Sequence, residues 1–129
     1  MASIFTKIIN GEIPYYKIAE TNDFLAFLDI RPLKRGHVLC IPKLEVNYIF
    51  DLDDKTYIGL MRFSKKVAKA IKKVIACKRV GIVVIGLEVL HAHVHLIPLD
   101  AIADVNFSNF LSLEKEEMIE IAEKISSKM

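Results

Sequence analysis

The chain has 129 residues, a formal net charge of +2 and a hydrophobic fraction of 53%. That length fits one compact domain with a substantial core, and the charge does not favour a nucleic-acid partner. No apolar run is long enough for a signal peptide or a membrane span, and the two cysteines stand far apart without a CxxC pair. We therefore expect a cytoplasmic protein with no membrane or nucleic-acid partner.

The N-terminal third predicts a short helix followed by a hairpin. Ser3 is a favourable N-cap for a helix that Asn10 and Gly11 would end. Residues 24–30 ("FLAFLDI") and 37–42 ("HVLCIP") are apolar and predict two strands. The intervening "RPLKRG" is typical of a turn, because proline bends the chain and glycine releases it.

The rest of the chain predicts two helices around a second pair of strands. Asp51 is the expected N-cap of a long helix whose apolar residues recur at helical spacing up to Ile75. Residues 79–85 and 88–97 predict strands separated by Gly86. A last helix is expected from about Ser112, with an apolar stripe of Met118, Ile121, Ala122 and Ile125. Paired strands with helices grouped outside them indicate an α+β fold with an antiparallel sheet.

Three of the four histidines stand at alternate positions in "LHAHVHLIP", residues 90–98. In a strand, alternate side chains point to the same face, so His91, His93 and His95 would lie together. The residues between them would face the core: Ala92, Val94 and Leu96. An imidazole row buried without hydrogen bonds is costly, so we expect it to line a cleft.

Three interpretations of this row stay open from the residues alone. A lone histidine is commonly a hydrogen-bonded bystander, but three in register make that reading less favourable. Two histidines at i and i+2 can reach one zinc ion, although no cysteine pair or carboxylate cluster completes a shell here. Neutral imidazole is also a nucleophile, and protonated imidazole stabilises phosphoryl oxygens. The pattern favours this last chemistry, at a phosphate.

The sequence resembles the histidine-triad (HIT) family in three blocks that occur in the right order. The His-x-His-x-His motif is followed by two apolar residues and Pro98. "IFTKIINGEIP" (residues 4–14) resembles the family's N-terminal segment, and "AFLDIRPLKRGHVLCIPK" (residues 26–43) resembles its central block. The resemblance extends to about Pro98 and points to the Hint-like branch.

The resemblance implies a five-stranded antiparallel sheet with two main helices, extended across a homodimer. It implies one domain over residues 1–129, with a core of 3–100 and a C-terminal helical tail of 101–129. The implied activity is hydrolysis at the α-phosphate of a purine nucleotide conjugate, a phosphoramidate or phosphoanhydride, without a cofactor or bound metal. The alternatives are a nucleotide-binding scaffold with little turnover and a metal-binding module on the histidine row.

Residue roles follow from the same resemblance. His93 would attack phosphorus and form a nucleotidyl-histidine intermediate. His95 would contact the phosphate and help to manage the leaving-group proton, while His91 and His37 would orient the other two. Asp29 would bind the ribose hydroxyls, a good chemical fit for a carboxylate. The positions around the base would be Ile4, Phe5, Ile8, Ile13, Phe27, Leu28 and Ile30, although ordinary core packing is the commoner role of such residues.

The sequence departs from the family pattern before the triad and after "IPK". In residues 81–90 ("GIVVIGLEVL"), Val89 matches a site position, but Leu87 replaces a glutamine and Glu88 stands where a hydroxyl residue often contacts phosphate. A carboxylate beside a phosphate is repulsive unless it is turned away, protonated or paired with a cation. Leu44 and Glu45 replace the usual basic-His pair. These changes favour a phosphoramidate over a dinucleoside polyphosphate as substrate.

Overall fold

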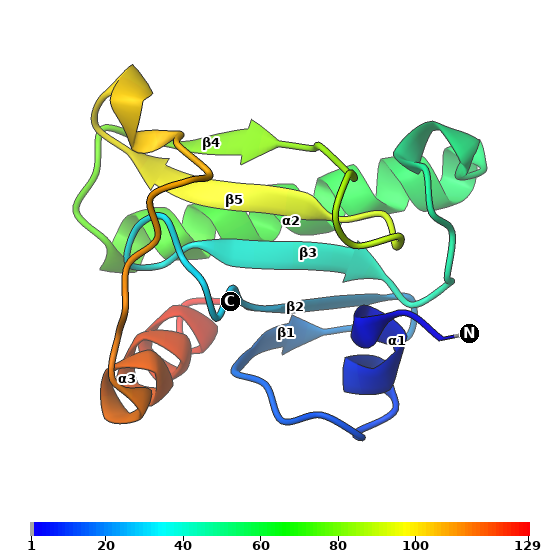
Figure 1. The fold of residues 1–129 in the computed structure, drawn as a ribbon, viewed down its shortest axis with the longest axis horizontal. Helices are drawn as coiled ribbons and strands as arrows, with labels where there is room; N and C mark the ends of the chain where they lie inside the picture. Colours follow the sequence, from blue (N-terminus) through cyan, green and yellow to red (C-terminus); the bar gives the residue numbers. More distant parts are fainter. Residues whose placement is uncertain (1) are drawn as a thin grey trace.

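The computed structural model describes residues 2–129, and a five-stranded antiparallel sheet forms its centre (Figure 1). Its spatial order is β1 (Lys17–Glu20), β2 (Phe24–Leu28), β3 (Val38–Pro42), β5 (Val94–Leu99) and β4 (Arg79–Val83). The predicted hairpin is confirmed, because β2 pairs with β3 from Phe24 opposite Pro42 to Leu28 opposite Val38. The expected α+β fold with this sheet is therefore present.

Helices cover both faces of the sheet. The short α1 (Ile4–Ile9) lies in front of it in Figure 1, and the long α2 (Asp54–Val74) lies behind it. The last helix, α3 (Lys115–Ser126), packs with α2 in the larger of two hydrophobic cores, whereas Phe5 and Ile8 of α1 belong to the smaller one. Burial from both sides explains why β3 is apolar along its whole length, with all five residues buried.

The helix ends agree with the sequence at α1 and differ elsewhere. Ser3 caps α1 by accepting the N–H of Thr6, as expected. The N-cap of α2 is Asp53 rather than Asp51, because Asp51 closes a short 3₁₀ helix, Ile49–Asp51. The N-cap of α3 is Glu114, two residues after the expected Ser112. The predicted apolar stripe of α3 is buried, with Met118, Ile121, Ala122 and Ile125 all in the larger core.

The strand predictions need three corrections. Both β2 and β4 end two residues earlier than expected, at Leu28 and Val83. The short β1 was not predicted, because its sequence "KIAE" buries only Ile18 and shows no clear alternation. A second 3₁₀ helix, Ile102–Asp104, follows β5.

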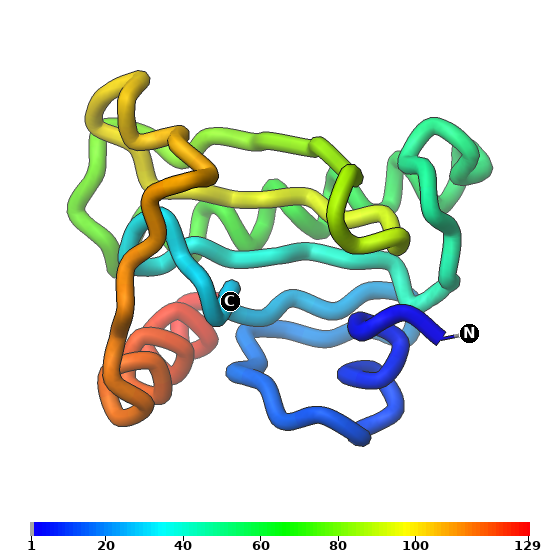
Figure 2. The backbone as a smooth tube through the Cα atoms, in the orientation of Figure 1, coloured from blue at the N-terminus to red at the C-terminus, as the bar shows by residue number. Residues whose placement is uncertain are grey.

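The third correction concerns the histidine segment, where β5 begins only at Val94. Residues 84–93 form a loop that folds back over the sheet (Figure 2). Gly86 turns the chain with a φ of +74°. The N–H of Ala92 is used by the carbonyl of Val46, 2.7 Å away, and not by a strand partner. The backbone is therefore drawn toward the segment after β3 before the strand starts.

None of the helices in residues 2–129 combines the length and the apolar character needed to cross a membrane.

Candidate active site

The alternation predicted for the histidine segment is present even though only His95 lies in a strand. Ala92, Val94 and Leu96 belong to the larger core. The ring of His93 instead packs against Phe5 of α1, with ring centroids 5.1 Å apart. The histidines are nevertheless almost fully buried, since His37, His91, His93 and His95 are 1%, 0%, 6% and 8% exposed. Imidazoles this deeply buried need hydrogen-bond partners.

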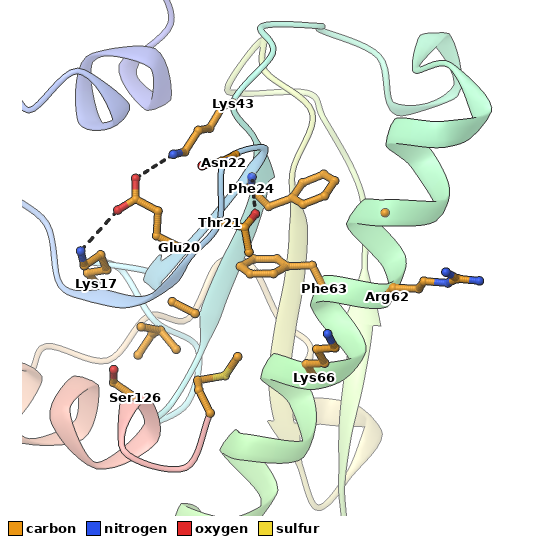
Figure 3. Close-up of a pocket in the computed structure, with 14 residues that line it drawn as sticks. Lys17, Glu20, Thr21, Asn22, Phe24, Lys43, Arg62, Phe63, Lys66 and Ser126 are labelled. Atoms are coloured by element: carbon orange, nitrogen blue, oxygen red, sulfur yellow. Dashed lines mark hydrogen bonds and ion pairs between the residues drawn. The ribbon is translucent and has the colours of Figure 1, made fainter.

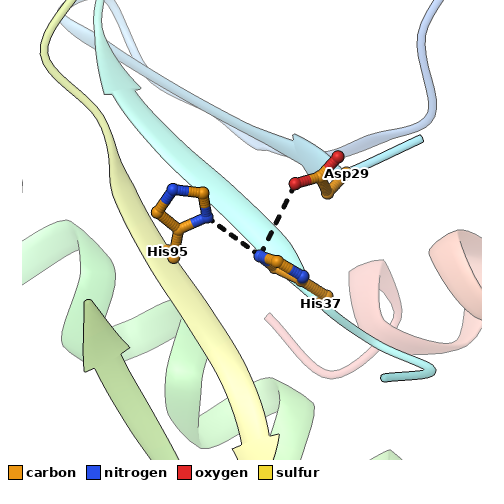
Figure 4. A group of neighbouring side chains, drawn as sticks. All are labelled: Asp29, His37 and His95. Carbon is orange, nitrogen blue, oxygen red and sulfur yellow. Dashed lines mark hydrogen bonds and ion pairs between the residues drawn. The ribbon is translucent and has the colours of Figure 1, made fainter. Parts of the chain in front are cut away.

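His37 and His95 form one pair (Figure 4). A backbone amide determines where their protons lie. The N–H of Leu33 donates to His37 Nδ1 at 3.0 Å, so the proton of neutral His37 must be on Nε2. His37 Nε2 lies 3.0 Å from His95 Nδ1 and donates to it. His95 Nδ1 therefore accepts, and His95 carries its own proton on Nε2. This pair presents an N–H group.

His91 and His93 form a second pair that carbonyl oxygens determine. His91 Nε2 lies 2.8 Å from the carbonyl of Pro42, and His93 Nδ1 lies 2.7 Å from the carbonyl of His91. A carbonyl can only accept, so both ring nitrogens donate. His93 then keeps an unprotonated Nε2 with its lone pair. Of the four histidines, His93 is thus the one with a free Nε2 lone pair.

The surroundings of His37, His93 and His95 favour their neutral forms. Burial lowers the pKa of His37 to about 3, with nearby His95 and His93 adding to the effect. Burial likewise lowers the pKa of His95 to about 4, again helped by His93. Burial also lowers the pKa of His93, against the opposing effect of its bond to the His91 carbonyl. At neutral pH, the His93 ring is therefore uncharged, with its Nε2 lone pair unprotonated.

Asp29 lies beside the His37–His95 pair, just after β2. One carboxylate oxygen accepts the N–H of Arg31 at 2.9 Å, and the other lies 3.6 Å from His37 Nε2 (Figure 4). Burial raises the pKa of Asp29, and the charge of Glu88 adds to the rise. Asp29 thus has one oxygen committed to a turn and the other directed toward the imidazoles.

Within residues 2–129, the side chains grouped closely enough to hold a metal ion are Asp29, His37 and His95. The row of three histidines does not form such a group. Their ligand atoms lie within 4.8 Å of one another. His37 Nδ1 already accepts the Leu33 N–H, so metal binding through Nε2 would leave the ring an imidazolate. The hydrogen bonds of these residues therefore do not fit a divalent metal.

The apolar residues expected around the base separate into three groups. Phe5, Ile8, Ile13, Phe27 and Val89 gather in the smaller core, on the side of the sheet where His93 lies. Ile4 and Ile30 are exposed, at 48% and 69%. Leu28 lies on the opposite side of the sheet, in the larger core, because neighbouring strand residues alternate in direction. We therefore leave Leu28 out of the proposed base site.

In the loop before the triad, the two residues that differ from the family pattern point outward. Leu87 is 83% exposed, and Glu88 is exposed as well. Glu88 nevertheless lies close enough to Asp29 to raise the pKa of that carboxyl. Its carboxylate is therefore solvated at the edge of the site and is not buried among the imidazoles.

One site residue, Phe107, had no role assigned from the sequence. Its ring packs edge-on against His95, with centroids 5.0 Å apart, and lies 6.5 Å from His37. The segment that carries it crosses in front of the sheet in Figure 1 and is held where the Leu111 N–H donates to the Pro32 carbonyl at 2.8 Å. No local sequence signal indicates contacts across such a separation in the chain.

A hollow of the surface lies away from the histidines, between β1 and the helices α2 and α3 (Figure 3). It measures about 880 Å³ and contains none of the four histidines. Lys17 and Lys43 at its edge are paired with Glu20. The imidazole geometry, and not the size of a hollow, therefore locates the candidate chemistry.

Comparisons with known proteins all point to one family. Residues 10–102 match the HIT domain family. An uncharacterized HIT-like protein of Borreliella burgdorferi is 39% identical, with 95% of each chain covered. An adenosine 5'-monophosphoramidase of Schizosaccharomyces pombe is 36% identical, over 100% of this chain and 99% of that one.

Solved structures agree with this result. A crystal structure of a Hit-like protein involved in cell-cycle regulation from Bartonella henselae has a TM-score of 0.86 at 31% identity, covering 98% of this chain and 96% of that one. A zinc-bound histidine triad family protein from Mycobacterium smegmatis has a TM-score of 0.84 at 25% identity, covering 99% and 93%. The fold, the four histidines and the match over residues 10–102 show that this chain belongs to the HIT family.

Proposed function

We propose that the protein hydrolyses purine nucleoside phosphoramidates, releasing a nucleoside monophosphate through a covalent intermediate on His93. The observation that carries the proposal is the tautomer of His93: its Nδ1–H is used by the His91 carbonyl, so Nε2 holds a free lone pair. The lowered pKa keeps that lone pair unprotonated at neutral pH. The name of the Schizosaccharomyces relative supports this substrate class.

The reaction divides into two displacements at phosphorus. In the first, His93 Nε2 forms a bond to the α-phosphorus while the bond from phosphorus to the leaving nitrogen breaks. The leaving nitrogen takes the electron pair and one proton from solvent. In the second, water attacks phosphorus, loses a proton and returns the electron pair to His93. One water is consumed overall, and its two hydrogens appear on the amine and the released phosphate.

The neighbouring groups take complementary roles in this proposal. His95 offers its Nε2–H to the phosphoryl oxygens or to the leaving atom, where charge develops. Asp29 binds the ribose hydroxyls with the carboxylate oxygen that the Arg31 amide leaves free. Phe5 and Phe27 form the floor of the base site, with Ile4 and Ile30 as its exposed rim. No step requires a metal ion.

Trapping the intermediate tests the proposal directly. The protein is quenched in acid-free denaturant during turnover of adenosine 5'-phosphoramidate, digested and analysed by mass spectrometry. An adenylyl group on His93 is expected, together with its absence in a His93→Gln variant. Turnover with the group on another residue, or with none on His93 under rapid quench, would contradict the proposed mechanism.

A nucleotide-binding role with little turnover is the second candidate, and the exposed loop before the triad favours it. The side chains of Leu87 and Glu88 offer no donor to a phosphate from this loop. Calorimetry with adenosine monophosphate beside a turnover assay separates the two functions. Tight binding without hydrolysis across phosphoramidates and phosphoanhydrides would favour the second candidate.

The homodimer is also a proposal, supported by the edge of the sheet. β4 is an edge strand, and Ile82, Val84 and Ile85 on or just after it are 52%, 39% and 44% exposed. Exposed apolar edge strands are prone to pair with a second chain. Sedimentation velocity should show a dimer that Ile82→Lys weakens, and a monomeric wild-type protein would contradict the proposal.

A further inference from the structure

A cluster of polar side chains joins the start of α1 to His91 and to the segment after β3. Ser3 Oγ lies 2.8 Å from His91 Nδ1. Glu45 Oε1 accepts from the backbone N–H of Ser3 and from the hydroxyl of Thr6, both at 2.6 Å. These contacts link residues up to 88 positions apart in the chain, so no local sequence pattern predicts them.

The shortest contacts of this cluster define an arrangement of its protons in which every group is paired. His91 Nε2 donates to the Pro42 carbonyl, so His91 Nδ1 must accept. The Ser3 hydroxyl is the donor to that nitrogen, while its oxygen accepts the N–H of Thr6 at 3.0 Å. The Thr6 hydroxyl then donates its hydrogen bond to Glu45 Oε1. Every donor is used once, which leaves His91 held at both ring nitrogens.

The residue held in this way is also the residue that orients the nucleophile. The backbone carbonyl of His91 accepts the Nδ1–H of His93 at 2.7 Å. Phe5, which lies between Ser3 and Thr6, packs against both rings, at 5.8 Å from His91 and 5.1 Å from His93. A shift of α1 would therefore move the hydrogen-bond acceptor of His93 and its packing surface together.

Glu45 is the exposed end of this arrangement, and it stays charged. Its bonds to the Ser3 amide and the Thr6 hydroxyl lower its pKa to about 2. Contacts of an exposed carboxylate usually add little to the free energy of folding. Two short hydrogen bonds to a neighbouring segment therefore suggest that Glu45 does something other than stabilise the fold. Here the bonds order the N-terminal turn of a helix of only six residues.

We propose that Glu45 is a positioning residue that acts through Thr6, Ser3 and His91 to hold His93 in its Nδ1–H tautomer and attacking orientation. The inference rests on the proposed function, because His93 is the nucleophile only in that reaction. It assigns a role to a position where the sequence departs from the family's usual residues. A small displacement of an attacking group lowers the rate more than it lowers substrate binding.

Three variants test this role. Glu45→Ala removes the acceptor, and we expect kcat to fall about 10-fold with KM changed less than about 2-fold. Glu45→Gln keeps an oxygen acceptor without the charge, so most of the rate should be retained. Ser3→Ala removes the donor to His91 Nδ1 and should resemble Glu45→Ala. Glu20→Ala is the matched control, because Glu20 is also an exposed carboxylate with two partners, Lys17 and Lys43, but contacts no histidine.

A spectroscopic measurement separates positioning from folding and from the proposed reaction. In the wild type, ¹⁵N NMR should show His93 protonated on Nδ1 and His91 protonated on Nε2. Glu45→Ala and Ser3→Ala should mix the two tautomers at one or both rings, while Glu20→Ala should not. An inactive wild type would refute the reaction, and the NMR result would still decide the network. Unchanged ¹⁵N shifts with kcat within 2-fold in both disrupted variants would overturn the inference.

Discussion

The two histidine pairs are built from the same side chain but end in opposite chemistry. The His37–His95 pair is anchored by a donor, the Leu33 N–H, so each ring accepts on Nδ1 and the pair presents an N–H. The His91–His93 pair is anchored by acceptors, the carbonyls of Pro42 and His91, and it ends in a lone pair on His93. Backbone groups, and not neighbouring charges, therefore leave an N–H on His95 and a lone pair on His93.

The largest expected effect comes from replacing His93, whose Nε2 carries the lone pair. His93→Ala and His93→Gln should both lower kcat/KM by at least about 10³-fold, because neither side chain carries a nucleophilic nitrogen. Steady-state release of adenosine monophosphate from adenosine 5'-phosphoramidate measures this. Hydrolysis at nearly the wild-type rate in either variant would show that His93 is not the nucleophile.

Replacing His95, the N–H donor, should lower the rate less, and an amide side chain should recover part of the loss. His95→Ala should lower kcat about 10²-fold, the usual effect of losing one donor to a developing charge. His95→Gln places an N–H near the position of Nε2 and should recover part of that loss. The same assay compares the two variants. Equal rates for His95→Ala and His95→Gln would contradict a donor role for His95.

The pH dependence of stability should follow the buried rings. His37 and His95 have pKa values of about 3 and about 4 when folded, against 6.5 ordinarily. The unfolded chain therefore binds more protons below about pH 6.5, and the free energy of unfolding should fall as the pH drops through this window. The slope approaches ~1.4 kcal/mol per pH unit for each histidine.

Urea unfolding at about pH 7, 6 and 5 measures this slope, because Glu20, Glu45, Asp104 and Glu120 have lowered pKa values and titrate below the window. The lowered pKa of His93 adds to the slope, and the raised pKa of Asp29 opposes it. His37→Asn keeps an acceptor for the Leu33 N–H and removes one titrating ring, so its slope should be shallower. An identical slope in both proteins would show that His37 does not carry the effect.

The smallest expected effect concerns Phe107, which packs against the His37–His95 pair. Phe107→Ala would hydrate His95 and raise its pKa toward 6.5, which should shift the acid limb of kcat/KM upward while changing the rate at neutral pH less than about 3-fold. Phe110→Ala is the control, because Phe110 contacts Arg31 and not an imidazole. A matching shift in both variants would mean that Phe107 has no specific contact with the site.

Much of the fold could be predicted from sequence because its signals are local. The cap at Ser3, the hairpin of β2 and β3 and the apolar stripe of α3 each depend on residues within a few positions. The errors lie where distant segments compete for the backbone. The expected strand before Val94 is a loop because Val46 takes the N–H of Ala92. The short β1 escaped prediction because pairing with β2, and not its own pattern, makes it a strand.

By itself, the sequence determined that the histidines occur in a HIT motif and that alternate residues, Ala92, Val94 and Leu96, face the core. Only the tertiary structure decided what each imidazole can do. The proton of a neutral histidine sits on whichever nitrogen meets an acceptor, and the partners here come from distant or backbone groups such as the Ser3 hydroxyl and the Pro42 carbonyl. Spacing alone carries no information about those partners, so four identical side chains acquired their different hydrogen-bond patterns only when the chain folded.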